Sequence, residues 1–186
     1  MGQQQHAQAV DSKLFRFWLV EAIQADVREP PAMTLSTVGA EGRPSSRVLI
    51  LKGFSNGGLQ FASSRTSRKG RELSATPWAA ASFYWRELGR QVRVTGRVLD
   101  TGRGGRRTRL PHPLAASCAE SLVAHQSERL EQRDQLDAAL DEARAQLLDD
   151  PGLVPDHWTL LPAQARRGEF WQADRDRRHT SASATC

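Results

Sequence analysis

Over the first hundred positions of the chain, apolar and polar residues alternate in short runs, and residues typical of turns lie between these runs. The first run repeats apolar residues at helical spacing and predicts a helix over Leu14–Asp26, ended by Glu29-Pro30-Pro31. Later runs of β-branched and apolar residues predict strands over Met33–Val38, Arg47–Lys52, Leu59–Ser63, Trp78–Trp85 and Gln91–Val98. The links at 39–42 and 55–58 are typical of hairpins, so an antiparallel meander closing into a small barrel is expected.

Two further helices accompany these strands. Ser67–Ala75 begins at a serine that can cap a helix and ends just before Pro77. Apolar residues at helical spacing predict another helix over Ser127–Leu148, with Leu136, Leu140, Ala143 and Leu147 on one face. The predicted fold class is therefore mainly β with flanking helices (α+β), preceded by a flexible segment at 1–12.

Composition limits the classes of protein that remain. The chain has 186 residues, of which 39% are hydrophobic and 25% charged, as in soluble globular domains. No run approaches the roughly 18 apolar residues of a membrane span, and the polar start MGQQQHAQ has no apolar leader, so a cytoplasmic protein is expected. Cys118 and Cys186 alone support neither a disulfide framework nor a cysteine metal site.

The positive charge of the chain is mostly arginine. Lys and Arg number 26 against 21 Asp and Glu, and lysine occurs only at Lys13, Lys52 and Lys69. The arginine fork suits phosphate and carboxylate recognition, although a GC-rich gene would also give an arginine-rich chain. Both a phosphorylated small molecule and a nucleic acid are compatible with this charge. The arginine-rich segment 101–109 has no interleaved aromatic residues, which disfavours nucleic acid.

The run Ser67-Arg68-Lys69-Gly70-Arg71 places cations at the first turn of a predicted helix. Cations there oppose the helix dipole, and a bound anion would offset that cost. The run therefore predicts a phosphate site, with a solvated basic turn as the alternative.

Other candidates are weaker when each is taken alone. Arg47 and Lys52 flank an apolar run and lie on opposite strand faces, and both could be solvated strand ends. The amide of Gln91 could pair with a flat heterocycle, although an ordinary surface glutamine is the simpler interpretation. Trp171 could be a core aromatic or a wall against a ring system.

Two positions later in the chain leave similar alternatives. Ser127, which follows Gln126, could contact a ligand or only cap the long helix. The cluster Arg177-Arg178-His179 could be a solvated tail, or could bind an anion and supply a titrating imidazole. No GxGxxG, P-loop, GxSxG or metal-spaced ligand pattern is present, which disfavours Rossmann dinucleotide binding and metal hydrolysis.

The order of these motifs resembles the pyridoxamine 5′-phosphate oxidase family of FMN-dependent split barrels. The matching runs are Arg47-Val-Leu-Ile-Leu-Lys52-Gly, Ser67-Arg-Lys-Gly-Arg-Glu-Leu73, Phe83-Tyr-Trp85, Arg90-Gln-Val-Arg93, Gln126-Ser127 and Glu169-Phe-Trp-Gln172, followed by Arg177 and His179. The resemblance implies an antiparallel, homodimeric split β-barrel with FMN at the dimer interface. It further implies a single domain over 13–179 and a divergent tail at 180–186.

The resemblance also implies roles for individual residues. Those that would bind the cofactor are Arg47, Val48, Leu49, Ile50, Leu51, Lys52, Ala62, Ser63, Arg68, Lys69, Gln91, Gln126, Ser127 and Trp171. Those that would bind the substrate are Lys52, Ser117, Arg177 and His179, and the last two would be catalytic. No metal is implied.

The chain departs from the family pattern in two segments. Arg109 and Pro113 stand where the family has a Tyr and an Arg for the substrate phosphate, and Ser181 replaces an arginine that contacts FMN. Because codons for 101–113 and 180–186 can be read in a shifted frame that restores family-like residues, frame errors in both segments are one hypothesis.

The implied function is FMN-dependent oxidation of pyridoxamine or pyridoxine 5′-phosphate to pyridoxal 5′-phosphate, with oxygen as the electron acceptor. One alternative is a related oxidase of the phenazine-pathway type, acting on an aromatic substrate without a phosphate. Another is a flavin-binding protein with little turnover.

Overall fold

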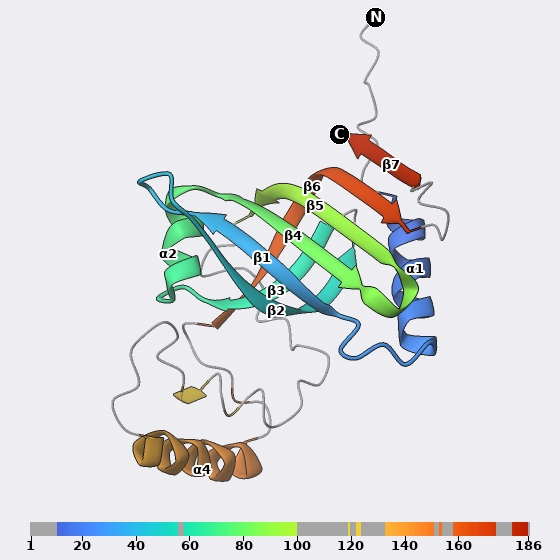
Figure 1. The fold of residues 1–186 in the computed structure, drawn as a ribbon. Helices are drawn as coiled ribbons and strands as arrows, with labels where there is room; N and C mark the ends of the chain where they lie inside the picture. The colour runs from blue at the N-terminus through green and yellow to red at the C-terminus, as the bar shows by residue number, and fades with distance from the viewer. Residues whose placement is uncertain are drawn as a thin grey trace, which may run out of the picture. The chain divides into compact units, whose positions relative to one another are not determined.

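The computed structural model describes residues 11–55, 58–99, 119, 122–123, 133–150, 153, 158–173 and 180–185. Its elements, in chain order, are α1 (Ser12–Gln24), β1 (Ala32–Val38), β2 (Pro44–Ser55), β3 (Gly58–Ser64), α2 (Arg68–Ala75), β4 (Trp78–Trp85), a 3₁₀ turn (Arg86–Leu88), β5 (Arg90–Val98), α4 (Arg133–Asp149), β6 (Trp158–Gln172) and β7 (Thr180–Thr185) (Figure 1). Every strand predicted over the first hundred residues is present, and each lies within one residue of its expected bounds except β2, which is three residues longer at each end.

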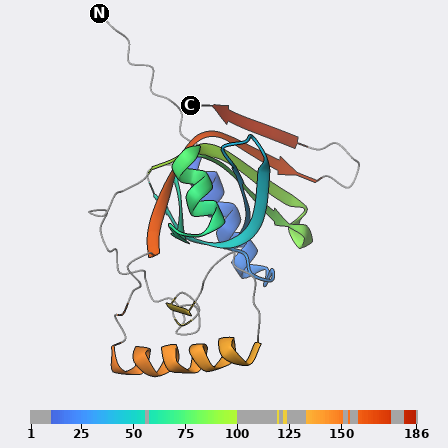
Figure 2. The same cartoon turned by 90° about the vertical axis from the view of Figure 1, so that its left-hand side faces the viewer.

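The strands form an antiparallel barrel. Their order is β3-β2-β1-β4-β5-β6-β7, and an additional β3–β6 pairing closes the first six strands into a ring. Strand β7 pairs with Arg167 to Gln172 of β6 and with no other strand in the described residues. It therefore extends the sheet beyond β6. The predicted fold class, an antiparallel split barrel with flanking helices, is confirmed (Figures 1 and 2).

The two predicted hairpins are also present. At the first, the amide of Gly39 donates to the carbonyl of Arg43 over 3.0 Å, and Gly42 adopts a φ of 75°, a left-handed conformation that favours glycine. At the second, Ser55 pairs directly with Gly58. These turns set the register in which the residues of β2 face those of β1 and β3.

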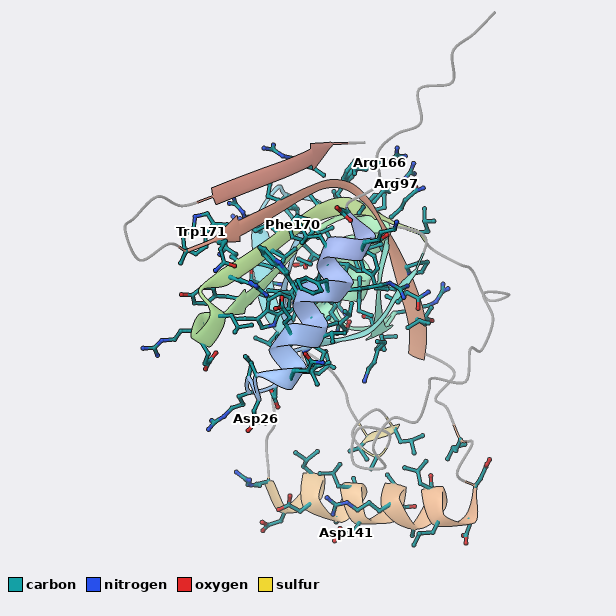
Figure 3. The ribbon with its side chains drawn as sticks, turned by 90° about the vertical axis from the view of Figure 1, so that its right-hand side faces the viewer. Asp26, Arg97, Asp141, Arg166, Phe170 and Trp171 are labelled. Atoms are coloured by element: carbon teal, nitrogen blue, oxygen red, sulfur yellow. The ribbon has the colours of Figure 1, made fainter. Side chains whose placement is uncertain are left out.

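Helix α1 packs against the barrel through aromatic residues (Figure 3). Phe15 is fully buried, and its ring centroid lies 4.7 Å from that of Phe54 and 5.1 Å from that of Phe83. Trp18 meets Phe170 of β6 edge-on at 5.4 Å. The helix begins at Ser12, two residues before the predicted start, and its N-cap Asp11 accepts hydrogen bonds from the amides of Lys13 and Leu14.

Strands β6 and β7 were not among the elements predicted. In β6 every second residue from Leu161 to Ala165 is buried, as expected of a strand, but the next buried residues are Gly168 and Phe170, so the alternation shifts by one position. A bulge opposite the Thr95–Gly96 step of β5 causes that shift, and a Cβ at Gly96 would meet the backbone of Gln164. Pro162 and the small residues of this strand further weaken the pattern that a strand normally shows.

The chain divides into two compact units. One contains Met1–Phe61, Glu72–Asp100 and Leu161–Cys186, and the other contains Ala62–Arg71 and Thr101–Leu160. In the second unit, Ala143 and Leu147 of α4 form a small separate core with Ala119. The predicted helix Ser127–Leu148 is confirmed over Arg133–Asp149, and its first residues lie outside the described ones.

The expectation that residues 13–179 form a single domain stays a prediction. No helix in the described residues is long and apolar enough to cross a membrane.

Candidate cofactor-binding site

The structure places the predicted site residues in three groups. Arg47 to Lys52, Gln91 and Trp171 belong to the first compact unit, on β2, β5 and β6. Ala62, Ser63, Arg68 and Lys69 belong to the second, in the segment 62–71 that we call the basic turn. The remaining candidates, Ser117, Gln126, Ser127, Arg177 and His179, lie outside the described residues, so their roles stay predictions.

The basic turn is built from hydroxyl groups. Ser67 is the N-cap of α2, because its Oγ accepts a hydrogen bond from the amide of Gly70 over 3.2 Å. The same hydroxyl donates to the carbonyl of Ser64 over 2.7 Å and accepts from Nζ of Lys69 over 3.3 Å. Ser63 and Ser64 are each 1% exposed. The turn is therefore fixed by its own side chains before any ligand binds.

The charge of the basic turn is entirely positive. It contains Arg65, Arg68, Lys69 and Arg71 and no acidic residue. Arg68 is exposed, whereas Lys69 is only 6% exposed. Cations and hydroxyls at the first turn of a helix are the donors that a phosphate monoester requires.

Arg47 points toward the core side of the sheet, because its cross-strand partner Leu35 is buried. Its Nη1 donates to the carbonyl of Leu35 and, over 2.6 Å, to Oγ1 of Thr37. Its Nη2 donates to Oγ of Ser45 over 2.6 Å and to Oε2 of Glu72 over 3.3 Å. We call Thr37, Ser45, Arg47 and Glu72 the Arg47 cluster.

The rest of the predicted flavin-binding run alternates between two faces of β2. Val48 and Ile50 are 64% and 38% exposed on the outer face, whereas Leu51 is part of the core. Lys52 falls at a bulge between Leu51 and Gly53, where the register with β3 shifts. Bulges change the direction of side chains and are frequent next to functional sites. The bulge therefore gives Lys52 a direction that differs from the one regular strand alternation would give it.

Gln91 and Trp171 lie side by side on the outer face of the barrel. Tyr84 pairs with Gln91, and Gln91 pairs with Trp171, so their side chains form one row across β4, β5 and β6. Phe170, the neighbour of Trp171, faces the opposite way into the core (Figure 3). The registers of β2, β1 and β4 put Val48 on this same outer face as Tyr84. Four separated candidates, Val48, Ile50, Gln91 and Trp171, thus all face outward from the barrel.

Sequence reasoning missed the buried partners of Arg47. Thr37 is fully buried and continues the inward phase of Met33 and Leu35, so strand alternation alone marks it as a polar residue facing inward. Ser45 faces it across the hairpin. Glu72 lies on the second turn of α2, but nothing in the sequence pairs it with β1 and β2.

Comparison with known proteins gives the family of the chain. A family model described as pyridoxamine 5′-phosphate oxidase matches residues 19–147. The chain belongs to this family. Among curated relatives, the pyridoxine/pyridoxamine 5′-phosphate oxidase of Paracidovorax citrulli is 40% identical over 89% of this chain and 73% of its own length. The corresponding oxidase of Methylibium petroleiphilum is 39% identical over 94% of this chain and 81% of its own length.

Solved structures add a second kind of relative from the family. PhzG of Burkholderia lata, in complex with tetrahydrophenazine-1-carboxylic acid, is 30% identical with a TM-score of 0.76, and the match covers 96% of this chain and 93% of PhzG. An FMN-binding protein of Nostoc punctiforme related to pyridoxamine 5′-phosphate oxidase shares the fold, with a TM-score of 0.71 at 15% identity. The expected membership in a family of flavin-type oxidases is confirmed.

The residues of this family member fit a flavin that carries a phosphate. Within the second compact unit, the basic turn has cationic and hydroxyl donors of the kind that a phosphate needs. Within the first, the outer-face row of Gln91 and Trp171 has an amide and an indole of the kind that a flat ring needs. Among the residues that the structure describes, no group of three His, Cys, Asp or Glu side chains could hold a metal ion.

Proposed function

We propose that this protein oxidises pyridoxamine or pyridoxine 5′-phosphate to pyridoxal 5′-phosphate, with FMN as cofactor and oxygen as electron acceptor. The observation that carries the proposal is the basic turn, a hydroxyl-lined helix start with four cations and no acid. Bound FMN would supply the redox chemistry, accepting a hydride from the substrate and passing two electrons to oxygen. The relatives named for this activity support the choice of substrate.

The residues of the chain would bind and orient the two reactants. Arg68 and Lys69 would hold the FMN phosphate, while Gln91 and Trp171 would contact the flavin ring. Lys52 at its bulge would face the substrate, together with Ser117, Arg177 and His179. Arg177 and His179 would lie beside the reacting carbon, where an arginine favours developing negative charge and an imidazole can exchange a proton.

We propose that the working form is a homodimer. Val48, Ile50 and Tyr84 are apolar or aromatic side chains exposed on the outer face that also carries Gln91 and Trp171. A second copy that covered this face would bury them and enclose the flavin. Light scattering should report about twice the chain mass of 20.6 kDa. A flavin-loaded particle of one chain mass at micromolar concentration would contradict the dimer.

The phenazine-pathway alternative has its own supporting observation. PhzG matches the chain over nearly its whole length, and Arg109 and Pro113 stand where the oxidases of pyridoxine phosphate have their Tyr and Arg. A substrate without a phosphate would not need that pair.

Anaerobic reduction of the bound flavin distinguishes these functions. Purified yellow protein would be mixed without oxygen with pyridoxamine 5′-phosphate, pyridoxine 5′-phosphate or a reduced phenazine carboxylic acid, and bleaching of the flavin absorbance would be recorded. We expect bleaching by the phosphorylated substrates. Bleaching only by the phenazine would favour the alternative, and bleaching by none would indicate a flavin-binding protein with little turnover.

Ser181 provides a further test of the proposed site. Its backbone pairs with Trp171 across β6 and β7, in the place where the family has an arginine that contacts FMN. We expect Ser181→Arg to speed stopped-flow reduction of the flavin and Arg177→Ala to slow it. Equal rates for both variants and the natural chain would show that this tail does not reach the substrate.

A further inference from the structure

We propose that Glu72 is a positioning residue for the phosphate of the cofactor, acting through Arg47 and through helix α2. The inference rests on the proposed function, because it assigns a device to the same phosphate site. Glu72 follows the cationic first turn of α2, in which Arg68 and Lys69 are the first two helical residues. Any group that fixes Glu72 therefore also fixes the direction in which this helix start presents its cations.

Glu72 is held from two strands at once. Its side chain is 9% exposed, and both carboxylate oxygens accept from Oγ of Ser45, over 2.9 and 2.7 Å. Oε2 also accepts from Oγ1 of Thr37 on β1 and from Nη2 of Arg47 on β2. A carboxylate with this many donors has one orientation, and α2 is thereby attached to the ends of β1 and β2.

The same contacts immobilise Arg47. Each of its two terminal nitrogens has two acceptors, and Glu72 is the charged one among them. An arginine directed toward the core side of a sheet needs such a counter-charge, because an unpaired buried charge is costly. Glu72 thus holds an arginine that the family resemblance assigns to the cofactor.

Two other roles for Glu72 make different predictions. A carboxylate acting only by its charge would repel a phosphate, so its neutralisation would strengthen binding of FMN. A carboxylate acting only as structural support would change thermal stability and leave the recognition of phosphate untouched. A positioning residue predicts weaker recognition of the phosphate once Glu72 is neutralised.

The experiment compares FMN with riboflavin, which lacks the phosphate. The full-length apoprotein would be titrated with each flavin by fluorescence quenching, giving the ratio of the riboflavin Kd to the FMN Kd, and Tm would be measured in parallel. Glu72→Gln keeps the shape of the side chain and removes its charge. We expect the ratio to fall about tenfold, as for the loss of one charge-assisted hydrogen bond.

A matched control and a second variant complete the design. Glu21→Gln removes another Arg–Glu pair, that of Arg90 and Glu21 at 2.5 Å, and should leave the ratio unchanged. Ser45→Ala removes the hydroxyl that donates to both oxygens of Glu72, so it should also lower the ratio of the riboflavin Kd to the FMN Kd. This second variant tests the positioning role of Glu72 if Glu72→Gln does not fold.

The outcomes separate the two proposals. If the natural chain binds FMN more tightly than riboflavin and Glu72→Gln retains or increases that preference, the positioning role is wrong and the proposed function stands. An equal fall in the Glu21→Gln control would also overturn it. If the natural chain binds neither flavin, the proposed function itself fails.

Discussion

Two arginines attach helices to the same barrel, and they do so in different surroundings. Arg90 donates to Oε2 of Glu21 on α1 over 2.5 Å, with its Cζ 4.8 Å from the centre of the Trp18 ring. Arg47 is bound by hydroxyls and by Glu72 on α2. The side chains of Arg90 and Arg47 are 18% and 22% exposed, but those of Glu21 and Glu72 are 34% and 9% exposed.

The difference lies in what else holds each helix. Phe15, Trp18 and Ala22 of α1 all enter the main core, so its ion pair is added to an apolar interface. Of α2, Leu73 alone among the described residues belongs to that core. Helix α2 therefore depends on a polar attachment, and polar attachments have stricter geometry than apolar ones. This is the helix that begins with Arg68 and Lys69, so under the proposed function its placement would affect recognition of the phosphate.

Phe15→Ala would test the apolar attachment and should have the largest effect. Phe15 is fully buried against Phe54, Phe83 and Trp85, so truncation leaves a cavity in the core. We expect a loss of about 4 kcal/mol in the free energy of unfolding, measured by urea denaturation. A loss below about 1 kcal/mol would mean that α1 is held by something other than this interface.

Glu72→Ala would test the polar attachment in the same denaturation assay. Removing the carboxylate leaves Arg47 half-buried without its counter-charge and takes away the nearest acceptor of the Thr37 hydroxyl. We expect a loss of about 3 kcal/mol, near the lower limit for breaking a buried ion pair because Arg47 retains some solvent. If Leu73→Ala alone destabilised the protein and Glu72→Ala did not, α2 would be attached by its apolar contact after all.

Much of this arrangement could be predicted from the sequence. The strands of the first hundred residues, the Ser67 cap and the Gly39–Gly42 hairpin follow from alternation and turn chemistry, which are local. The phosphate-binding interpretation of the basic turn also came from local chemistry, since a helix start and its cations are contiguous in the chain.

What was missed depends on contacts between distant segments. Strand β6 is stabilised by its register with β5, including a bulge that breaks the alternation, and contains Pro162. The row of Gln91 and Trp171 joins positions 80 residues apart, and only the registers of β5 and β6 bring them together. The partnership of Glu72 with Thr37 likewise requires the hairpin and the helix to be placed first.

Arg68→Ala would extend the comparison to an exposed arginine of the basic turn itself. Arg68 is exposed at the start of α2, so its removal should leave the free energy of unfolding almost unchanged. Affinity for FMN should fall by about 2 kcal/mol, or roughly thirtyfold, as a charge-assisted contact to the phosphate is lost. Isothermal titration of the apoprotein measures this. A double variant, Arg68→Ala with Lys69→Ala, that purifies with its full flavin content would refute the assignment of both residues.

Glu21→Ala should have the smallest effect and sets the lower limit of the comparison. Glu21 is partly exposed, so water and salt screen its pairing with Arg90, and a pair of this kind contributes about 0.5 kcal/mol. Arg90 would keep its hydrogen bond to Gln172 and its contact with the Trp18 ring, so α1 would stay in place. We expect the effect on the free energy of unfolding to shrink further as salt is raised from 50 mM to about 1 M, where the screening length is about 3 Å. A different result would contradict the contrast between a polar and an apolar attachment. It would be a loss in the free energy of unfolding as large as that of Glu72→Ala and insensitive to salt, because both ion pairs would then stabilise their helices equally.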